Sequence, residues 1–445
     1  MAVRSGPLGP LGRLLSLASL RPLRRREFAL VWFAALVSNI GSWLQTVAVG
    51  VLVTALTGQA RWTGLVAAAA FVPVGVLSPV GGAIADRVDR RRLLLWTTIG
   101  ETVFASLLAV LVATGHATPL GVTAMVFGAG CMTALGFPAY QAILPDLVDR
   151  EDLLGASSLT MVQYNLGRVV GPALAGVVLV AGSYTWAFAL NAVSYGAVVV
   201  ALLMVRLPPP SPSDEPPGLW SRIAAGFRGA QAEPGCRTAI LTIAVAALLL
   251  SPFIALIPAV ALKLFDEKES GTSVLITAQG IGAVAGALAL ASLALRYGRR
   301  RVLIVNLLVL PVLLMAYAAS PSLPAAAVAL AAVGASYVTL LSSLGTVVQL
   351  RAPAVLRARI LSLYMVALGT VYPLGAVLQG AVGDRLGLRA VTAGSAAVFL
   401  MVVVAAGLAR PDLARSLDDP APDPSIDPGD ERQAPGAQPA APPAG

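Results

Sequence analysis

Two charged side chains lie inside long apolar runs of this sequence, Glu101 and Arg168. Charge is scarce in the chain, because only 12% of its 445 residues are charged and 57% are hydrophobic. At the rise of a helix, Glu101 lies ~14 Å beyond the basic cluster that ends at Arg92, and Arg168 lies ~20 Å into its own run. Either they pair, or Glu101 carries a proton, which a buried carboxyl can hold at physiological pH, or they are structural or snorkelling side chains. Because ionisable groups are expensive to bury in a membrane, we name both as candidates for proton coupling.

Other chemistry-bearing residues are few. The single histidine, His116, lies in a short loop, and Cys131 and Cys236 lack metal-ligand spacing. We therefore expect no metal site, no cofactor and no enzymatic activity. No G-x-x-x-x-G-K-[ST] motif occurs, so ATP hydrolysis does not drive the protein. The net charge of +9 sits in short loops, which argues against a nucleic-acid partner.

The elements that position these residues are membrane helices. With a mean hydropathy of +0.81, the chain is too apolar to be a soluble domain of its size. Lipid offers the backbone no hydrogen-bond partners, so only helices and closed barrels span it, and continuous apolar runs argue against a barrel. Twelve runs are long enough to span: 28–56, 62–85, 92–114, 120–144, 154–182, 184–206, 237–262, 271–295, 301–319, 322–349, 358–382 and 388–409.

We predict an all-α membrane protein of two six-helix bundles, 28–206 and 237–409, joined by a cytosolic Pro-rich linker at 207–236. Residues 1–27 are expected to be an uncleaved cytosolic leader, because an Arg cluster stands where a cleavage site would be. The Pro-, Ala- and Asp-rich tail 410–445 is expected to be disordered. Most Lys and Arg residues fall in the leader and after the even-numbered runs, which places both termini in the cytosol.

The two halves repeat each other. "RVDRRRLL" (87–94) reappears as "RYGRRRVL" (296–303), and "LPDLVDREDLLGASSL" (144–159) has a counterpart in "LRAPAVLRARILSLYM" (350–365). Basic loops recur on the inner side of any membrane protein, but the matched positions favour a true repeat. Two parallel six-helix halves are the architecture of a rocking transporter with its site at the midplane between them.

The first inner hairpin carries a motif within "GGAIADRVDRRRLLL" (81–95). Its residues resemble the G-x-x-x-D-R-x-x-R-R signature of the major facilitator superfamily: Gly82, Asp86, Arg87, Arg90 and Arg91. The resemblance implies that superfamily's fold, with two six-helix bundles related by pseudo-two-fold symmetry. It also implies a latch of the outward-facing state, in which the Asp meets a helix N-terminus of the opposite half and the Arg meets an acidic residue.

This motif supplies the predicted inner gate. A carboxylate at a helix N-terminus gains about 0.3–1 kcal/mol, and up to ~2 when partly buried. Asp146 is the expected partner of Arg90, with Asp149 as its substitute, because charge-assisted Arg pairs are directional. Gly82 is expected to let helices approach closely. Positive-inside anchoring alone would explain the arginines but not Asp86.

The sequence departs from the family pattern in three places. Asp89 stands where the family often has Gly, which leaves the geometry of the turn open. In the second half, Leu295 stands at the position that corresponds to Asp86, so we expect that copy to act only as an anchor. The arginine of the family's fourth helix is also absent, so Arg168 stands in for it or the coupling differs.

A second motif, "NLGRVVGPALAG" (165–176), resembles the exporter signature of the family's fifth helix, with Ala175 in place of one glycine. Gly followed by Pro kinks a helix, and a face of small residues packs tightly against a partner. The resemblance implies an antiporter element that limits leak, and a simple packing kink is the alternative. The residues concerned are Gly167, Gly171, Pro172 and Gly176.

Polar and aromatic side chains in the other runs are candidates for the substrate cavity. An apolar site with few polar contacts suits amphiphilic or drug-like molecules better than sugars or ions, although such residues also act as interhelical hydrogen-bond partners. The candidates are Asn39, Gln45, Gln141, Tyr164, Asn191, Gln279, Tyr364, Tyr372 and Gln379.

These features together resemble a drug, siderophore or macrolide exporter of the major facilitator superfamily. The resemblance implies a monomeric antiporter in the cytoplasmic membrane that exports a hydrophobic or amphiphilic organic compound in exchange for protons. A lysophospholipid flippase of the same fold is the main alternative. A membrane-embedded enzyme would need clustered catalytic groups, and a signalling receptor would need a soluble output domain.

Overall fold

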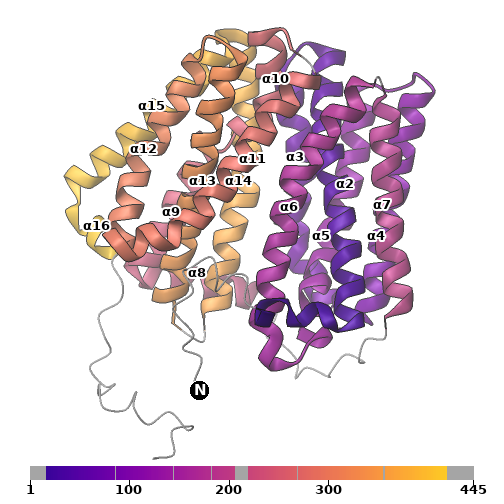
Figure 1. The fold of residues 1–445 in the computed structure, drawn as a ribbon. Helices are drawn as coiled ribbons and strands as arrows, with labels where there is room; N and C mark the ends of the chain where they lie inside the picture. The colour runs from indigo at the N-terminus through magenta and orange to yellow at the C-terminus, as the bar shows by residue number, and fades with distance from the viewer. Residues whose placement is uncertain are drawn as a thin grey trace, which may run out of the picture.

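The computed structural model consists of two bundles of long helices that stand side by side (Figure 1). It describes residues 17–85, 87–143, 145–181, 183–205, 219–267, 269–353 and 356–417. Asp86 of the predicted gate lies outside the described residues, as do the start of the leader, much of the linker and the end of the tail.

Six long helices form the first half. Their bounds are α2 (Arg26–Thr57), α3 (Ala60–Ala85), α4 (Arg90–Ala113), α5 (Pro119–Ile143), α6 (Leu153–Val180) and α7 (Tyr184–Met204). Three short 3-10 helices accompany them: η1 (Leu17–Arg24), η2 (Pro145–Leu147) and η3 (Arg150–Asp152).

The second half repeats this plan with one helix broken in two. Its bounds are α9 (Pro234–Leu249), α10 (Phe253–Phe265), α11 (Glu269–Tyr297), α12 (Arg299–Ala319), α13 (Leu323–Arg351), α14 (Arg357–Leu386) and α15 (Leu388–Ala409). The part of the chain predicted to be the Pro-rich linker, 207–236, contains α8 (Leu219–Ala232), which packs against α14. The short α16 (Pro411–Ser416) follows α15.

Eleven of these spans are long and apolar enough to cross a membrane, with α9 and α10 counted as one span. The protein is therefore a multi-pass membrane protein. The predicted run 154–182 forms α6, whose 28 residues give it spanning length. It is not among the eleven because polar side chains, Arg168 among them, occupy its centre.

The turn before α4 settles the geometry that Asp89 left open. The Asp89 carboxylate accepts a hydrogen bond from the backbone N–H of Arg92 at 2.9 Å and caps the helix. Gly298 precedes α12 at the equivalent position of the second half, with a φ of +82° that favours glycine. The two equivalent helices therefore start differently, α4 with a side-chain cap and α12 with a glycine of positive φ.

The predicted run 237–262 lies within one span, Pro234–Phe265, which the chain divides into α9 and α10 by a break between Leu249 and Phe253. Pro252 has no N–H to donate, which leaves carbonyl groups before it without helical partners. The side-chain amide of Gln379 in α14 donates to two of them, the carbonyls of Leu248 at 3.0 Å and Leu249 at 2.9 Å. The Gln379 amide thus replaces the missing backbone donors, so the break leaves these two carbonyls hydrogen-bonded in the apolar interior.

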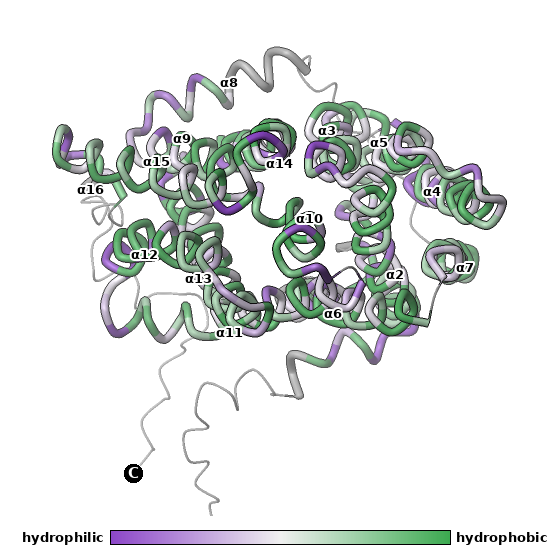
Figure 2. Tube along the Cα trace, turned by 90° about the horizontal axis from the view of Figure 1, so that it is seen from above, coloured by the Kyte–Doolittle hydropathy of each residue, from purple (hydrophilic) through white to green (hydrophobic). Residues whose placement is uncertain are grey.

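Packing within the halves follows the predicted repeat. The pairs α3–α5, α4–α7 and α2–α6 of the first half correspond to α11–α13, α12–α15 and α9–α14 of the second. The halves meet through two equivalent pairs, α3 with α14 and α6 with α11, and α10 lies at the centre of the view along the bundle (Figure 2). This pseudo-two-fold arrangement is the fold that the sequence predicted.

Candidate functional site

The two ends of the bundle differ in charge. We call the end that carries η1, the α4 and α12 starts and α16 the basic end, and the other end the opposite end (Figure 1). At the basic end, Arg21 and Arg25 before α2 form ion pairs with Asp152 and Asp149. The leader is therefore fastened to the start of α6, and Asp149 is engaged by Arg25.

The contact predicted between Arg90 and Asp146 is present at the basic end. The Nη1 atom of Arg90 lies 3.1 Å from an Asp146 carboxylate oxygen and 3.3 Å from the Ala142 carbonyl oxygen. Both side chains are 28% exposed. The pair joins α4 to the end of α5, so it lies entirely within the first half.

The other described gate residues also contact only the first half or solvent. Arg91 donates to the carbonyls of Leu202 at 2.6 Å and Leu203 at 2.7 Å, at the end of α7. Arg87 is exposed. The close helix approach expected at Gly82 occurs at Gly81 instead, where a Cβ would lie 2.8 Å from the Ala134 carbonyl oxygen.

A carboxylate that the sequence analysis did not single out joins the two halves at the opposite end. Asp384, near the end of α14, accepts hydrogen bonds from the first backbone N–H groups of α3, those of Ala60 at 2.7 Å and Arg61 at 2.9 Å. It also forms an ion pair with Lys263 of α10 at 2.7 Å, and its side chain is 16% exposed. We call these groups the opposite-end latch.

Further contacts strengthen the same end. The Tyr184 hydroxyl of α7 donates to the Glu269 carboxylate of α11 at 2.5 Å. A Cβ on Gly380 would lie 2.7 Å from the Ala60 carbonyl oxygen, so α14 reaches α3 only because this residue has no side chain.

The sequence contains a second copy of the inner motif around Asp384. Gly380, Asp384, Arg385 and Arg389 repeat the register of the inner motif. Arg389 even makes the equivalent contact, since it donates to the Ser320 carbonyl just past α12, as Arg91 does to the end of α7. This copy lies at the end of α14, at the opposite end from the basic loops in which the two halves repeat each other.

The two predicted coupling residues do not pair with each other. Glu101 accepts a hydrogen bond from the Thr133 hydroxyl of α5 at 2.5 Å. The Arg168 guanidinium lies 5.7 Å from the centre of the Trp43 ring in α2, and it forms no ion pair with any acidic residue that the structure describes. Glu101 is thus held within the first half, while Arg168 lies on α6, one of the helices that meet the second half.

Several cavity candidates brace helices within one half. Asn39 donates to α6 carbonyls at 3.3 Å, Gln45 accepts from Asn191 at 2.9 Å, and the Tyr364 hydroxyl donates to the Leu341 carbonyl at 2.9 Å. Gln379 is committed to the break between α9 and α10. These polar side chains therefore form hydrogen bonds between helices, whereas the sequence analysis named them as lining for a substrate cavity.

Other cavity candidates lie where the halves meet. Tyr372 of α14 packs edge-on against Phe71 of α3, with ring centres 5.5 Å apart. Tyr164 of α6 is 52% exposed and lies beside Trp43, and Gln279 of α11 is 2% exposed. Gln141, near the end of α5, is exposed.

The glycines of the fifth-helix motif pack as predicted. A Cβ on Gly167 would lie 2.7 Å from the Asn39 side chain, and one on Gly171 would lie 2.5 Å from Cβ of Trp43, so both hold α6 against α2. Gly176 faces the other half, because its Cβ would lie 2.9 Å from Cβ of Ser273 in α11. Pro172 lies within α6 between these contacts.

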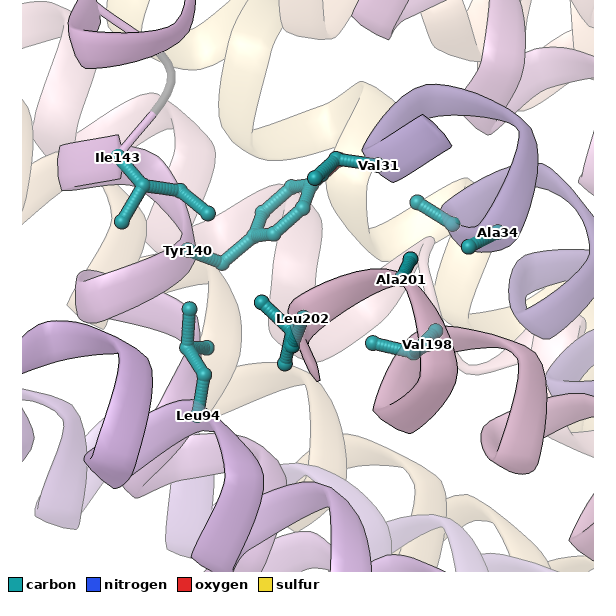
Figure 3. A pocket seen from close by; sticks show the side chains of 9 residues that line it. Val31, Ala34, Leu94, Tyr140, Ile143, Val198, Ala201 and Leu202 are labelled. Carbon is teal, nitrogen blue, oxygen red and sulfur yellow. The ribbon is translucent and has the colours of Figure 1, made fainter. Parts of the chain in front are cut away.

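A small pocket inside the first half is not a substrate site (Figure 3). Its lining is apolar apart from the Tyr140 hydroxyl, and no residue of the second half reaches it. A site that opens to either face in turn needs walls from both halves. The lining residues are Val31, Ala34, Ala35, Leu94, Tyr140, Ile143, Val198, Ala201 and Leu202.

Comparison with known families decides the class of the protein. A family model described as transmembrane secretion effector matches residues 17–425, nearly the whole chain. The chain belongs to this family of the major facilitator superfamily. It is a membrane transporter and not an enzyme, as the motif of the first inner hairpin and the paired bundles predicted.

Relatives of this chain include two kinds of exporter. It is 28% identical to the multidrug efflux pump Tap of Mycolicibacterium fortuitum over 399 residues, which cover 87% of this chain and 97% of that protein. It is 30% identical to the enterobactin exporter EntS of Shigella boydii over 211 residues, 46% of this chain and 50% of that protein.

Solved structures confirm the fold. A bacterial homologue of the human lysosomal transporter Spinster, inward-facing and unoccupied, aligns with a TM-score of 0.70 at 15% identity and covers 91% of this chain and all of that chain. A mutant of the nucleoside transporter NupG aligns with a TM-score of 0.71 at 14% identity and covers 85% of this chain and 99% of that chain. At these identities the likeness concerns the fold alone.

Proposed function

We propose that this protein exports amphiphilic organic compounds across the cytoplasmic membrane in exchange for protons, by alternating access between its two halves. The basic end is assigned to the cytosol, because positively charged loops resist translocation. The observation that carries the proposal is the opposite-end latch, through which a carboxylate of one half holds the first turn of a helix of the other. Relatives named as efflux pumps support the direction of transport.

In this account the described conformation is closed at the outer face and admits substrate from the cytosol. Opening toward the outside requires Asp384 to leave the backbone N–H groups of Ala60 and Arg61. The inner motif then closes the basic end, with Asp86 at the start of α14. Each closed state is stabilised by a carboxylate on a helix N-terminus, so neither is favoured by a large margin.

Glu101 is proposed as the proton carrier. Its partner is a hydroxyl, and no cation pairs with it among the residues that the structure describes. It can therefore gain or lose a proton without breaking an ion pair. Glu101 lies on α4, which packs against α7, and the Tyr195 hydroxyl of α7 lies 3.1 Å from the Ser42 hydroxyl of α2.

Transport in proteoliposomes tests this function. Purified protein is given an imposed pH gradient and a panel of dyes, antibiotics and siderophores. Glu101→Gln is expected to abolish gradient-driven efflux while substrate binding is retained, because a neutral amide cannot carry the proton. Glu151→Gln, the same change at an exposed carboxyl of the basic end, is the matched control and should pump normally.

Two outcomes would contradict the proposal. If Glu101→Gln pumps at the rate of the unmodified protein, the assignment of the proton carrier is wrong. If the unmodified protein moves lysophospholipid between leaflets without a gradient and moves no member of the panel, the protein is a flippase rather than an antiporter.

A further inference from the structure

Arg168 is a permanent positive charge in the middle of α6. A guanidinium cannot lose its proton in a protein, so the residue cannot lower its cost by neutralisation. No acidic side chain in the described part of the chain forms an ion pair with it, and the intramembrane carboxyl of Glu101 is engaged by Thr133. The charge of Arg168 is therefore met by the face of the Trp43 ring and by no acidic side chain among the described residues.

Both halves contribute to the surroundings of this charge. Its own half supplies the ring of Trp43, 5.7 Å from the guanidinium carbon, and Tyr164 lies edge-on to that ring at 6.1 Å. The second half supplies α11, which packs on α6 at the level of Arg168. A substrate held here would contact both halves, as alternating access requires.

Hydrogen-bond donors at this level lack acceptors. The Nε atom of Arg168 is buried without a hydrogen-bond partner among the described residues, and so is the amide nitrogen of Gln279. The next residue of α11, Gly280, packs on the Arg168 backbone, with its Cβ position 3.3 Å from the Arg168 carbonyl oxygen. Buried donors without acceptors are costly, so this level of the interface is suited to a ligand that accepts hydrogen bonds.

We propose that Arg168 binds the anionic group of the transported compound, so that the substrate is an organic anion. This inference rests on the proposed function and names its substrate class. Carboxylate, phosphate or sulfonate oxygens match the planar donors of a guanidinium, and an aromatic or apolar body matches Trp43 and Tyr164. A cationic compound would be repelled by the same charge.

Matched probes that differ only in charge test the proposal. Binding of 1-pyrenebutyrate and of its neutral methyl amide is measured by fluorescence on protein in lipid nanodiscs, with empty nanodiscs subtracted. The unmodified protein is expected to bind the carboxylate on the order of tenfold to hundredfold more tightly than the amide. Arg168→Gln should remove this preference without weakening amide binding, and Arg168→Lys should keep part of it. Arg410→Gln, at an exposed arginine beyond α15, is the control and should keep all of it.

Equal binding of the two probes by the unmodified protein, or a preference that survives in Arg168→Gln, would overturn the proposal. If Arg168→Gln does not fold, the preference of the unmodified protein decides, together with competition by a cationic pyrene trimethylammonium, which should not displace the carboxylate. The proposed function fails separately: an anion preference without gradient-driven transport contradicts proton antiport and leaves the role of Arg168 intact.

Discussion

The basic end and the opposite end of this transporter carry the same motif in two different situations. After α3, the described residues of the motif contact only their own half, through Arg90 with Asp146 and Arg91 with the end of α7. After α14, Asp384 crosses to the other half and caps α3. The arginine five residues after the motif's Asp makes the same contact at both ends, since Arg91 and Arg389 each donate to a carbonyl at the end of a neighbouring helix. Among the described residues, the ends differ in two ways. Only the opposite end shows a carboxylate of the motif bound to the other half, and only the basic end has the arginine that pairs with Asp146, because Leu388 stands at the position of Arg90.

The antiparallel pairing of α3 and α14 explains how one motif serves two faces. Because these helices run in opposite directions along the interface, the C-terminal end of each lies beside the N-terminal end of the other. An acidic residue at the end of either helix can therefore reach unpaired N–H groups at the start of its partner. This geometry is the basis of our proposal that a motif of fixed register closes either end in turn.

Loss of the opposite-end carboxylate is expected to have the largest effect. Asp384→Ala removes three charge-assisted hydrogen bonds, which we expect to destabilise the described conformation by about 3 kcal/mol. Ser273, 5% exposed in α11 and packed against Gly176 of the other half, reports this change when replaced by Cys after Cys131 and Cys236 are changed to Ala. Labelling by a membrane-impermeant maleimide should become at least tenfold faster, and an unchanged rate would show that Asp384 does not hold the halves together.

Pushing α14 and α3 apart beside Asp384 is expected to destabilise the described conformation less. Gly380→Ala places a Cβ 2.7 Å from the Ala60 carbonyl oxygen and should weaken the closed end by about 1–2 kcal/mol through overpacking. Gly394→Ala is the matched control, since its Cβ would have no neighbour within 4 Å. The melting temperature of purified protein should fall for Gly380→Ala and stay the same or rise for Gly394→Ala. Equal behaviour of the two variants would mean that the close approach of α3 and α14 is not needed.

The basic-end pair is expected to contribute least to stability. Arg90→Ala removes a partly exposed ion pair within one half, worth about 0–1 kcal/mol. We expect slower turnover in the proteoliposome assay, an unchanged order of preference among substrates, and no change in the labelling rate of Ser273→Cys. A large rise in that labelling rate would contradict the separation of roles between the two ends.

Hydrophobic runs were sufficient to predict most of the fold, because in lipid each apolar run of sufficient length must close its own backbone hydrogen bonds. The break before Phe253 was missed, since a single Pro within an apolar run is often accommodated by a kink. Here the chain relies on Gln379, more than a hundred residues away in sequence, to satisfy the freed carbonyls.

Site residues were harder to predict than helices. The contact of Arg90 with Asp146 follows from opposite charges at adjoining helix ends, and the sequence indicated it. The direction in which a polar side chain points does not follow from its type, so Asn39 and Gln45 were indistinguishable from Tyr164 before their partners were known. Asp384 was missed because its motif lies at the far face, where no copy of an inner loop was sought.

Distances across both ends test the exchange of latches most directly. Spin-label pairs at His116 and Ser322, at the opposite end, and at Glu151 and Arg410, at the basic end, are measured by double electron–electron resonance. Asp384→Asn should lengthen the first distance and shorten the second, and Asp86→Asn should do the reverse. If both variants move the two distances in the same direction, or neither moves them, the two carboxylates do not hold alternate faces of this transporter closed.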